Sequence, residues 1–371
     1  MGSKRSPSET GRAVALFVIL KLLILWFGVQ AYMVIRNESL PTPQSWLGIW
    51  NQWDAPHYLD IVRDGYVTEG DARRWIVFFP LFAWGTRVVN FVVQDPLTSA
   101  FLVSTVASLF VAALFFRLVR LDEDAEIAQE SVWYLAIFPT AYFLHIGYTE
   151  SLFLALALGC FLAARKEKWA VAGILGALAA LTRVNGALLA PALALEAFLI
   201  YRRTKRIDWR WLWIVAIGAG TAIYLWVNYS VTGDMFMFRK YQDEHWNHSF
   251  SLPLFSLLDA WRGIWLRPAS EAVMVGWQEL LFTIIATAAT VWSWFRVRAS
   301  YALWSTLNLA LFTSAGILLG SPRYSLAIFP IFICFAKITR ERPLLRAAIV
   351  AWSLSFLALF ASRFVTQNWA F

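Results

Sequence analysis

Long apolar stretches alternate with short polar or basic connections along most of this chain. Stretches such as 13–35, 211–231, 272–295 and 299–322 are long enough to cross a bilayer as helices, because about 20 apolar residues span the hydrocarbon. Of the 371 residues, 59% are hydrophobic and only 15% are charged. A soluble protein of this size could not bury so much apolar surface. The pattern therefore predicts an all-α polytopic membrane protein, with residues 1–371 forming a single integral membrane domain.

The positions of Lys and Arg predict how the chain is oriented. Basic residues precede the first span and gather again in short connections at 202–210, 296–298 and 337–346. Cytoplasmic loops of membrane proteins collect Lys and Arg. We therefore expect the N-terminus and these connections on the cytoplasmic side of a multi-pass protein.

Eleven spans satisfy this orientation and place the C-terminus outside. If 76–93 also crossed, every later basic loop would be inverted. That segment contains Pro80, Arg87 and Asn90, which favours a helix lying in the outer interface. The predicted spans lie near 13–35, 98–118, 132–147, 150–165, 169–182, 184–201, 211–231, 273–295, 301–319, 324–338 and 345–362.

The span predicted over 169–182 is too short for an ordinary crossing. Fourteen helical residues rise about 21 Å, against about 30 Å of hydrocarbon. Such a segment must be shielded by other helices or border a water-filled cavity, as discontinuous helices beside substrate sites do. A thinner local bilayer explains it equally well.

On this topology, the polar residues that interrupt the apolar pattern collect at the outer face. The first outer loop, 36–97, carries interfacial helices, and a second large outer loop covers 232–272. The candidate site residues, from distant parts of the chain, are Asp54, His57, Tyr58, Glu150, Arg183 (with Asn185), Arg239, Lys240, His245, Arg323 and Tyr324.

Asp54 is the candidate general base of this set. A helix that starts there, with Pro56 in its first turn, places His57 and Tyr58 on the same face as the carboxylate. His57 could then orient the carboxylate, bind a phosphate or help hold a metal, or it could be an interfacial polar contact. Asp54 itself could instead be a helix N-cap, and composition alone favours that alternative.

The other candidates suit an anionic substrate. Glu150 begins a span, where a carboxylate either interacts with the helix dipole or serves the site. Arg183 and Arg323, the latter beside Tyr324, offer planar charged groups that match phosphate oxygens. Either arginine could also extend to lipid headgroups.

Arg239, Lys240 and His245 form a basic stretch with Tyr241 and Trp246 in the second outer loop. This stretch could gate the entry of a substrate. An ordinary interfacial belt of aromatic residues explains it equally well.

Several classes of site have no signature here. The sequence contains no glycine-rich phosphate loop, no Asp-x-Asp and no Cys/His cluster at zinc spacing. The absence of Asp-x-Asp argues against a metal-chelated nucleotide-sugar donor, and no nucleic-acid partner is expected. No cofactor is indicated with certainty, although a divalent metal is compatible with the pattern. Cys160 and Cys334 both lie in apolar runs, which favours core packing over a disulfide.

A set of motifs in fixed order resembles the PIG-V-like mannosyltransferases of the GT-C superfamily. It covers roughly residues 13–340 and consists of Trp53-Asp54-Ala55-Pro56-His57-Tyr58 running on to Tyr66, Phe78-Phe79-Pro80-Leu81, Phe138-Pro139-Thr140 leading to Tyr148-Thr149-Glu150-Ser151-Leu152-Phe153, Thr182-Arg183 with Gly186, and Ser321-Pro322-Arg323-Tyr324 with Phe329-Pro330.

The resemblance implies a GT-C-type fold and a polyprenyl- or dolichyl-phosphate sugar as donor, typically mannose, with Asp54 of the first outer loop as the catalytic residue. The chain is compact and looks prokaryotic, so a plasma membrane is expected, and the eukaryotic acceptor does not carry over. The alternative function is a flippase or transporter of lipid-linked sugar. Transporters often contain an internal repeat, and none is evident here.

Overall fold

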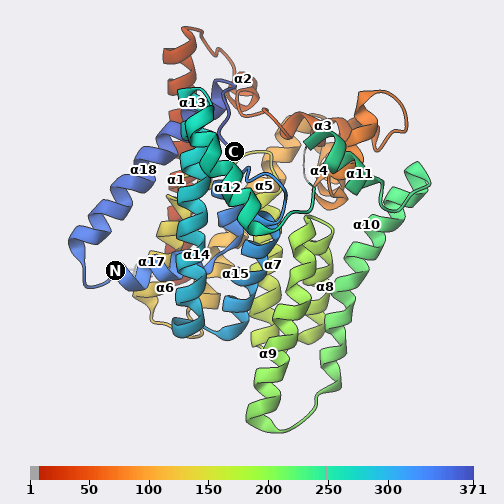
Figure 1. Cartoon of the computed structure of the whole chain (residues 1–371), viewed down its shortest axis with the longest axis vertical. Coiled ribbons are helices and arrows are strands. Elements are labelled where there is room, and N and C mark those ends of the chain that lie inside the picture. The colour runs from red at the N-terminus through yellow and green to blue at the C-terminus, as the bar shows by residue number, and fades with distance from the viewer. Residues whose placement is uncertain (1–7, 247–248) are drawn as a thin grey trace, which may run out of the picture.

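The computed structural model describes residues 8–246 and 249–371, and every regular element in those two ranges is a helix (Figure 1). Lys4 and Arg5, which contributed to the predicted orientation, lie outside the described residues. The longest elements are α1 (Glu9–Arg36), α5 (Pro96–Val119), η3 with α9 (Val184–Leu188, Leu189–Thr204), η4 with α10 (Trp209–Val215, Ala216–Thr232), α13, η5 and α14 (Ala269–Glu271, Ala272–Trp277, Gln278–Arg296) and α18 (Pro343–Val365).

Shorter helices connect and cover these elements. They are α2 (Pro43–Gly48), α3 (Ala55–Asp64), η1 (Asp71–Val77), α4 (Pro80–Val93), α6 (Ala125–Ala136), η2 (Ala141–Leu144), α7 (Glu150–Arg165), α8 (Trp169–Ala180), α11 (Met237–Trp246), α12 (Pro253–Leu266), α15 (Ala299–Thr313), α16 (Ser321–Tyr324), η6 (Ser325–Ala327) and α17 (Pro330–Thr339).

The predicted all-helical membrane architecture is confirmed, but the count of eleven spans is not. Within the described residues, six helices are long and apolar enough to cross a membrane, or up to eight if two bent pairs each count as one. The bends are 111° between η1 and α4 and 86° between α16–η6 and α17. The helix predicted over 132–147 ends at Ala136, and the span predicted over 301–319 ends at Thr313. Whether α4 lies in the interface stays a prediction.

The basic connections meet at one end of the molecule. Ion pairs join the turn after α5 to the ends of α7 and α17: Arg165 to Asp122 at 2.6 Å, Lys337 to Glu123 at 2.7 Å and Arg340 to Asp124 at 2.7 Å. Helix α5 leads from the first outer loop to this turn, and its 24 residues rise about 36 Å. In Figure 1 the connection between α9 and α10 lies at the bottom, whereas α2, α3, α11 and the C-terminus lie in the upper part. The charged loops and the first outer loop are therefore at opposite ends, as predicted.

The centre of the fold is the segment 137–149, between α6 and α7. Every residue in it is fully buried, although only the short turn η2 is regular. A buried irregular segment must satisfy its polar groups locally or against neighbours. Thr140 Oγ1 donates to the Pro322 carbonyl at 2.8 Å, and Ser104 Oγ donates to the Tyr148 carbonyl at 3.1 Å. The segment therefore ties α5 to the start of α16.

Both cysteines are buried with free thiols, as predicted from their apolar surroundings. Cys160 Sγ donates to the Ala172 carbonyl at 3.2 Å, which joins α7 to α8. These two helices pack closely, so α8 is shielded along α7 and α10 despite its twelve residues.

Candidate active site

Helix α3 places Asp54 at the centre of the site. Pro56 occupies the first turn of α3, where its missing N–H is not needed. At the other end of the helix, the Arg87 guanidinium of α4 donates to the carbonyls of Ile61 and Val62 at 3.0 and 2.7 Å. A cation on the last carbonyls of a helix both satisfies them and suits the helix dipole. The short helix is therefore fixed against α4, and Asp54 is fixed with it.

Asp54 occupies the N-cap position of α3, as the alternative predicted, but its side chain does not cap the helix. Its backbone is helical (φ −73°, ψ −24°) and its carboxylate accepts no capping hydrogen bond. The carboxylate instead accepts from Arg323 Nη1 at 2.7 Å, across 269 residues of sequence. The Asp54 side chain is 28% exposed, so it is still open to a substrate.

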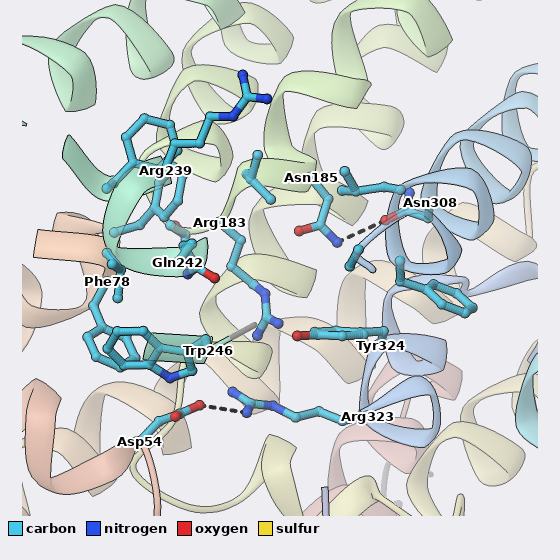
Figure 2. A pocket seen from close by; sticks show the side chains of 18 of the residues that line it. Asp54, Phe78, Arg183, Asn185, Arg239, Gln242, Trp246, Asn308, Arg323 and Tyr324 are labelled. Carbon is cyan, nitrogen blue, oxygen red and sulfur yellow. Dashed lines mark hydrogen bonds and ion pairs between the residues drawn. The ribbon is translucent and has the colours of Figure 1, made fainter. Parts of the chain in front are cut away.

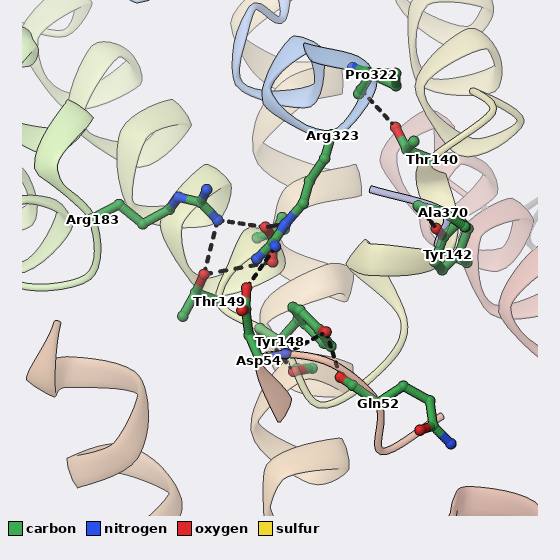
Figure 3. Close-up of polar contacts among 12 residues, drawn as sticks. Gln52, Asp54, Thr140, Tyr142, Tyr148, Thr149, Arg183, Pro322, Arg323 and Ala370 are labelled. Atoms are coloured by element: carbon green, nitrogen blue, oxygen red, sulfur yellow. Dashed lines mark hydrogen bonds and ion pairs between the residues drawn. The ribbon is translucent and has the colours of Figure 1, made fainter. Parts of the chain in front are cut away.

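Glu150, at the start of α7, joins the two predicted phosphate ligands. Its carboxylate accepts from Arg323 Nε and from Arg183 Nη1, and Arg183 Nη1 also donates to Thr149 Oγ1 at 3.0 Å. Glu150 is only 5% exposed, whereas the Arg183 side chain retains 16%. Figure 3 shows Asp54, Thr149, Arg183 and Arg323 converging from four separate parts of the chain. Two carboxylates thus balance two guanidinium groups.

Aromatic side chains of the 137–149 segment surround this cluster. The Arg323 guanidinium carbon lies 4.8 Å from the ring centroids of both Phe143 and Tyr148, an arrangement that attracts a cation. The Tyr148 hydroxyl donates to the Gln52 carbonyl at 2.6 Å and accepts from the Asp54 N–H at 3.2 Å (Figure 3). One tyrosine therefore contacts both Arg323 and the backbone of Asp54.

Arg183 is positioned by a tight turn at Gly186. A Cβ on Gly186 would lie 2.2 Å from the Ala180 nitrogen, so only glycine lets η3 fold back on the end of α8. The Leu81 N–H donates to the Leu181 carbonyl at 3.0 Å, which ties this turn to α4. The spacing of Thr182-Arg183 and Gly186 therefore has a structural role, because the tight turn directs Arg183 toward Glu150.

Arg323 is positioned by a buried carboxylate that the sequence analysis did not identify. Glu279 of α14 is fully buried and accepts from the N–H groups of Gly320 and Ser321 at 2.6 and 2.7 Å. Gly320 has φ +90°, a conformation that glycine adopts readily. Glu279 thus binds the backbone directly before Arg323.

A cavity of about 340 Å³ opens beside this cluster (Figure 2). A volume of this size is typical of small-molecule sites. Seven of the candidate residues line it, namely Asp54, Tyr58, Arg183, Asn185, Arg239, Arg323 and Tyr324. Burial raises the pKa of the Tyr58 phenol, so this wall carries a neutral hydroxyl.

The other predicted site residues do not line the cavity. Glu150 lies behind the two arginines that it binds. His57 is turned away, with its ring stacked on Trp75 at 3.6 Å between centroids, and burial lowers its pKa. Lys240 and His245 lie on the outer side of α11, 4.0 and 3.9 Å from Glu244. These side chains face away from the cavity, and the sequence alone does not show which way each helix face points.

Several lining residues were not predicted. Gln242 and Trp246 of α11 face the cavity from one side, with Phe78 beside them, and Asn308 of α15 faces it from the other (Figure 2). Asn308 was detectable as a lone amide within the apolar run 301–319. Among the described residues, no group of three or more Asp, Glu, His and Cys side chains is arranged to hold a metal ion.

Comparison with known structures shows which fold this chain shares. The structure superposes on a crystal structure of ArnT from Cupriavidus metallidurans bound to undecaprenyl phosphate, with a TM-score of 0.51 and 15% identity over 95% of this chain and 76% of that one. The fold is of the GT-C type. The predicted fold class is thereby confirmed.

Two sequence matches confirm the resemblance to mannosyltransferases inferred from the motifs. Residues 79–227 match the family model described as dolichyl-phosphate-mannose-protein mannosyltransferase. GPI mannosyltransferase 2 of Schizosaccharomyces pombe is 32% identical over 143 residues, which is 37% of this chain and 30% of the relative's own length. Asp54 and Arg323 lie outside the segment that the family model covers, so their roles are argued from the site itself.

Proposed function

We propose that this protein is an inverting glycosyltransferase that moves a sugar, mannose in the first instance, from a polyprenyl-phosphate donor to an acceptor hydroxyl. The proposed site faces the extracytoplasmic side of a prokaryotic plasma membrane. Its strongest support is that Arg323 binds Asp54 directly and shares Glu150 with Arg183. A base and two phosphate ligands thus border one cavity.

The reaction uses these groups in one displacement. Asp54 takes the proton of the acceptor hydroxyl as its oxygen attacks the anomeric carbon of the sugar. The bond from that carbon to the phosphate oxygen breaks, and the polyprenyl phosphate leaves with the bonding electrons. Arg183 and Arg323 neutralise the charge that develops on the phosphate.

The arrangement favours inversion over a two-step mechanism. A retaining enzyme needs a second carboxylate as nucleophile at the sugar carbon. Glu150 is 5% exposed and bound by two guanidinium groups, so it is not free to attack. Asp54 alone then serves as the base, and a single displacement inverts the anomeric centre.

The same site and the comparisons support the proposed donor and membrane partners. ArnT, which has this fold, has been crystallised with undecaprenyl phosphate, and the matched family model is named for dolichyl-phosphate mannose. A lipid-linked phosphate suits a site with two arginines at one end of a bundle of apolar helices. We infer that the surrounding lipids are the protein's other partners.

Replacement of Asp54 tests the proposal. The purified protein in nanodiscs receives polyprenyl-phosphate mannose and an extract of membrane glycans, and the release of free polyprenyl phosphate is measured. Asp54→Asn should lower turnover by about 10²- to 10⁴-fold, the usual contribution of a general base. Asp60→Asn, on the exposed face of the same helix and paired with Arg63, should leave turnover unchanged.

Two results would contradict the proposal. A folded Asp54→Asn variant with full turnover would remove Asp54 from its role. Movement of intact donor across the bilayer without release of polyprenyl phosphate would establish the flippase alternative instead.

A further inference from the structure

Two buried asparagines on one wall of the cavity form a chain of fixed polarity. Asn308 Nδ2 donates to the Trp304 carbonyl one turn earlier in α15, at 2.9 Å. Asn185 Nδ2 donates to Asn308 Oδ1, also at 2.9 Å. Asn185 and Asn308 are 8% and 2% exposed, and both line the cavity.

The backbone carbonyl of Trp304 fixes which end of each amide is the oxygen and which is the NH₂ group. A backbone carbonyl can only accept, so Asn308 must present its NH₂ group to Trp304 and its oxygen to Asn185. Asn185 must then present its NH₂ group to Asn308. Its oxygen is left toward the cavity, as Figure 2 shows, and no donor among the described residues reaches it.

We propose that Asn185 Oδ1 accepts a hydrogen bond from a hydroxyl of the transferred sugar and thereby selects the donor. This inference rests on the proposed function. An acceptor atom fixed in this way calls for a donor group on the ligand, and a sugar hydroxyl supplies one. Arg183 and Asn185 line the same cavity, so a sugar attached to a phosphate at Arg183 is placed to reach Asn185.

The opposite wall fits the same class of ligand. Gln242 and Trp246 of α11 face Asn185 across the cavity, whereas Tyr324 lies on the same side as Asn308 (Figure 2). The amide of Gln242 and the ring of Trp246 are neutral and suit a polyol, although Arg239 of the same helix adds one cation to this wall. The cavity thus has a cationic pair at Arg183 and Arg323, and Asn185 faces a wall of mostly neutral groups.

Binding measurements test the inference without knowledge of the acceptor. The affinity of the wild-type protein in nanodiscs is measured for a short-chain polyprenyl-phosphate mannose and for analogues in which each sugar hydroxyl in turn is replaced by hydrogen or by fluorine. At one position both replacements should weaken binding about tenfold, because fluorine cannot donate to Asn185 Oδ1. This comparison requires no variant.

The variant Asn185→Ala completes the cycle. Asn185→Ala should bind the parent donor about tenfold more weakly than the wild type does. The variant should bind the parent donor and the critical deoxy analogue equally well, because the side chain that accepted from the missing hydroxyl is gone. Its affinity for polyprenyl phosphate without sugar should match that of the wild type. Asn90→Ala, at an asparagine of α4 away from the cavity, should behave as wild type throughout.

The outcomes separate this inference from the proposed function. If no hydroxyl position is sensitive, or if the effects of analogue and variant simply add, the inference is wrong while the transferase proposal stands. If Asn185→Ala alters only the dependence on acceptor, the hydroxyl belongs to the acceptor and the inference is also wrong. If the wild type does not bind polyprenyl phosphate at all, both proposals are wrong.

Discussion

The replacement Glu150→Gln removes the one charge that both arginines share. In the wild type, Asp54 and Glu150 balance Arg183 and Arg323, whereas the variant has a single carboxylate against two guanidinium groups. Each lost attraction is about 4 kcal/mol at a separation of about 4 Å and an effective dielectric constant of about 20. Desolvation offsets part of this, and breaking a buried pair costs about 3–5 kcal/mol. We expect the free energy of unfolding to fall by about 3–5 kcal/mol in the variant.

The same change should increase the effect of the ligand on stability. A phosphate bound at Arg183 and Arg323 restores the missing negative charge, so it should bind the variant more tightly than the wild type. A ligand at about 100 times its Kd stabilises the folded state by about 2.7 kcal/mol, and tighter binding increases that gain. Turnover should nevertheless fall, because the arginines lose their fixed geometry and retain the departing phosphate.

Thermal unfolding in nanodiscs, with and without polyprenyl phosphate, measures both effects. Glu196→Gln is a matched control, because Glu196 is 1% exposed and binds Arg298 at 2.6 Å among the basic connections at the opposite end. It should destabilise the protein without increasing the shift caused by polyprenyl phosphate. An equal ligand-induced shift in wild type and Glu150→Gln would refute the charge-balance reasoning.

Three further predictions use other parts of the structure. Glu279→Gln should place an NH₂ group against a backbone N–H at the start of α16, costing about 1–3 kcal/mol of stability, and should weaken phosphate binding in a titration; Glu271→Gln, at an exposed position about two turns earlier, should do neither. Burial lowers the pKa of His57, so the unfolded chain binds more protons than the folded protein as the pH falls through about 6.5, and stability should fall with it. His57→Phe keeps an aromatic ring on Trp75 and should make the melting temperature less dependent on pH in this range. An unchanged pH dependence in the variant would contradict this prediction. Chelation of divalent metals should leave donor turnover unchanged, because two arginines supply the positive charge; loss of turnover with recovery on added Mg²⁺ would show otherwise.

The sequence identified much of the site because its residues break an apolar pattern. Arg183 and Arg323 each interrupt long hydrophobic runs, and a charge at such a place is costly unless it is paired or functional. Asp54 was identified by its motif in the first outer loop. The basic connections then assigned all three to one end of the molecule. The structure adds that Glu150 joins the two arginines, a contact that no spacing in the sequence could predict.

Other features escaped the sequence for definite physical reasons. The segment 137–149 is almost entirely apolar, and an apolar run reads equally well as a span or as buried irregular chain. Pro139 and Gly147 were the signals against a continuous helix. Glu279 could not be placed from the sequence, since its function depends on which way one face of α14 points.

The 137–149 segment also has a consequence for how the activity could change during evolution. Through Tyr148 it supports the backbone at Asp54, and through Thr140 it supports the start of the helix that bears Arg323. A substitution there would disturb proton removal and leaving-group departure together, so selection cannot adjust one without the other. Altered substrate preference should therefore arise on the walls formed by η3, α11 and α15, which can vary while the 137–149 segment stays constant.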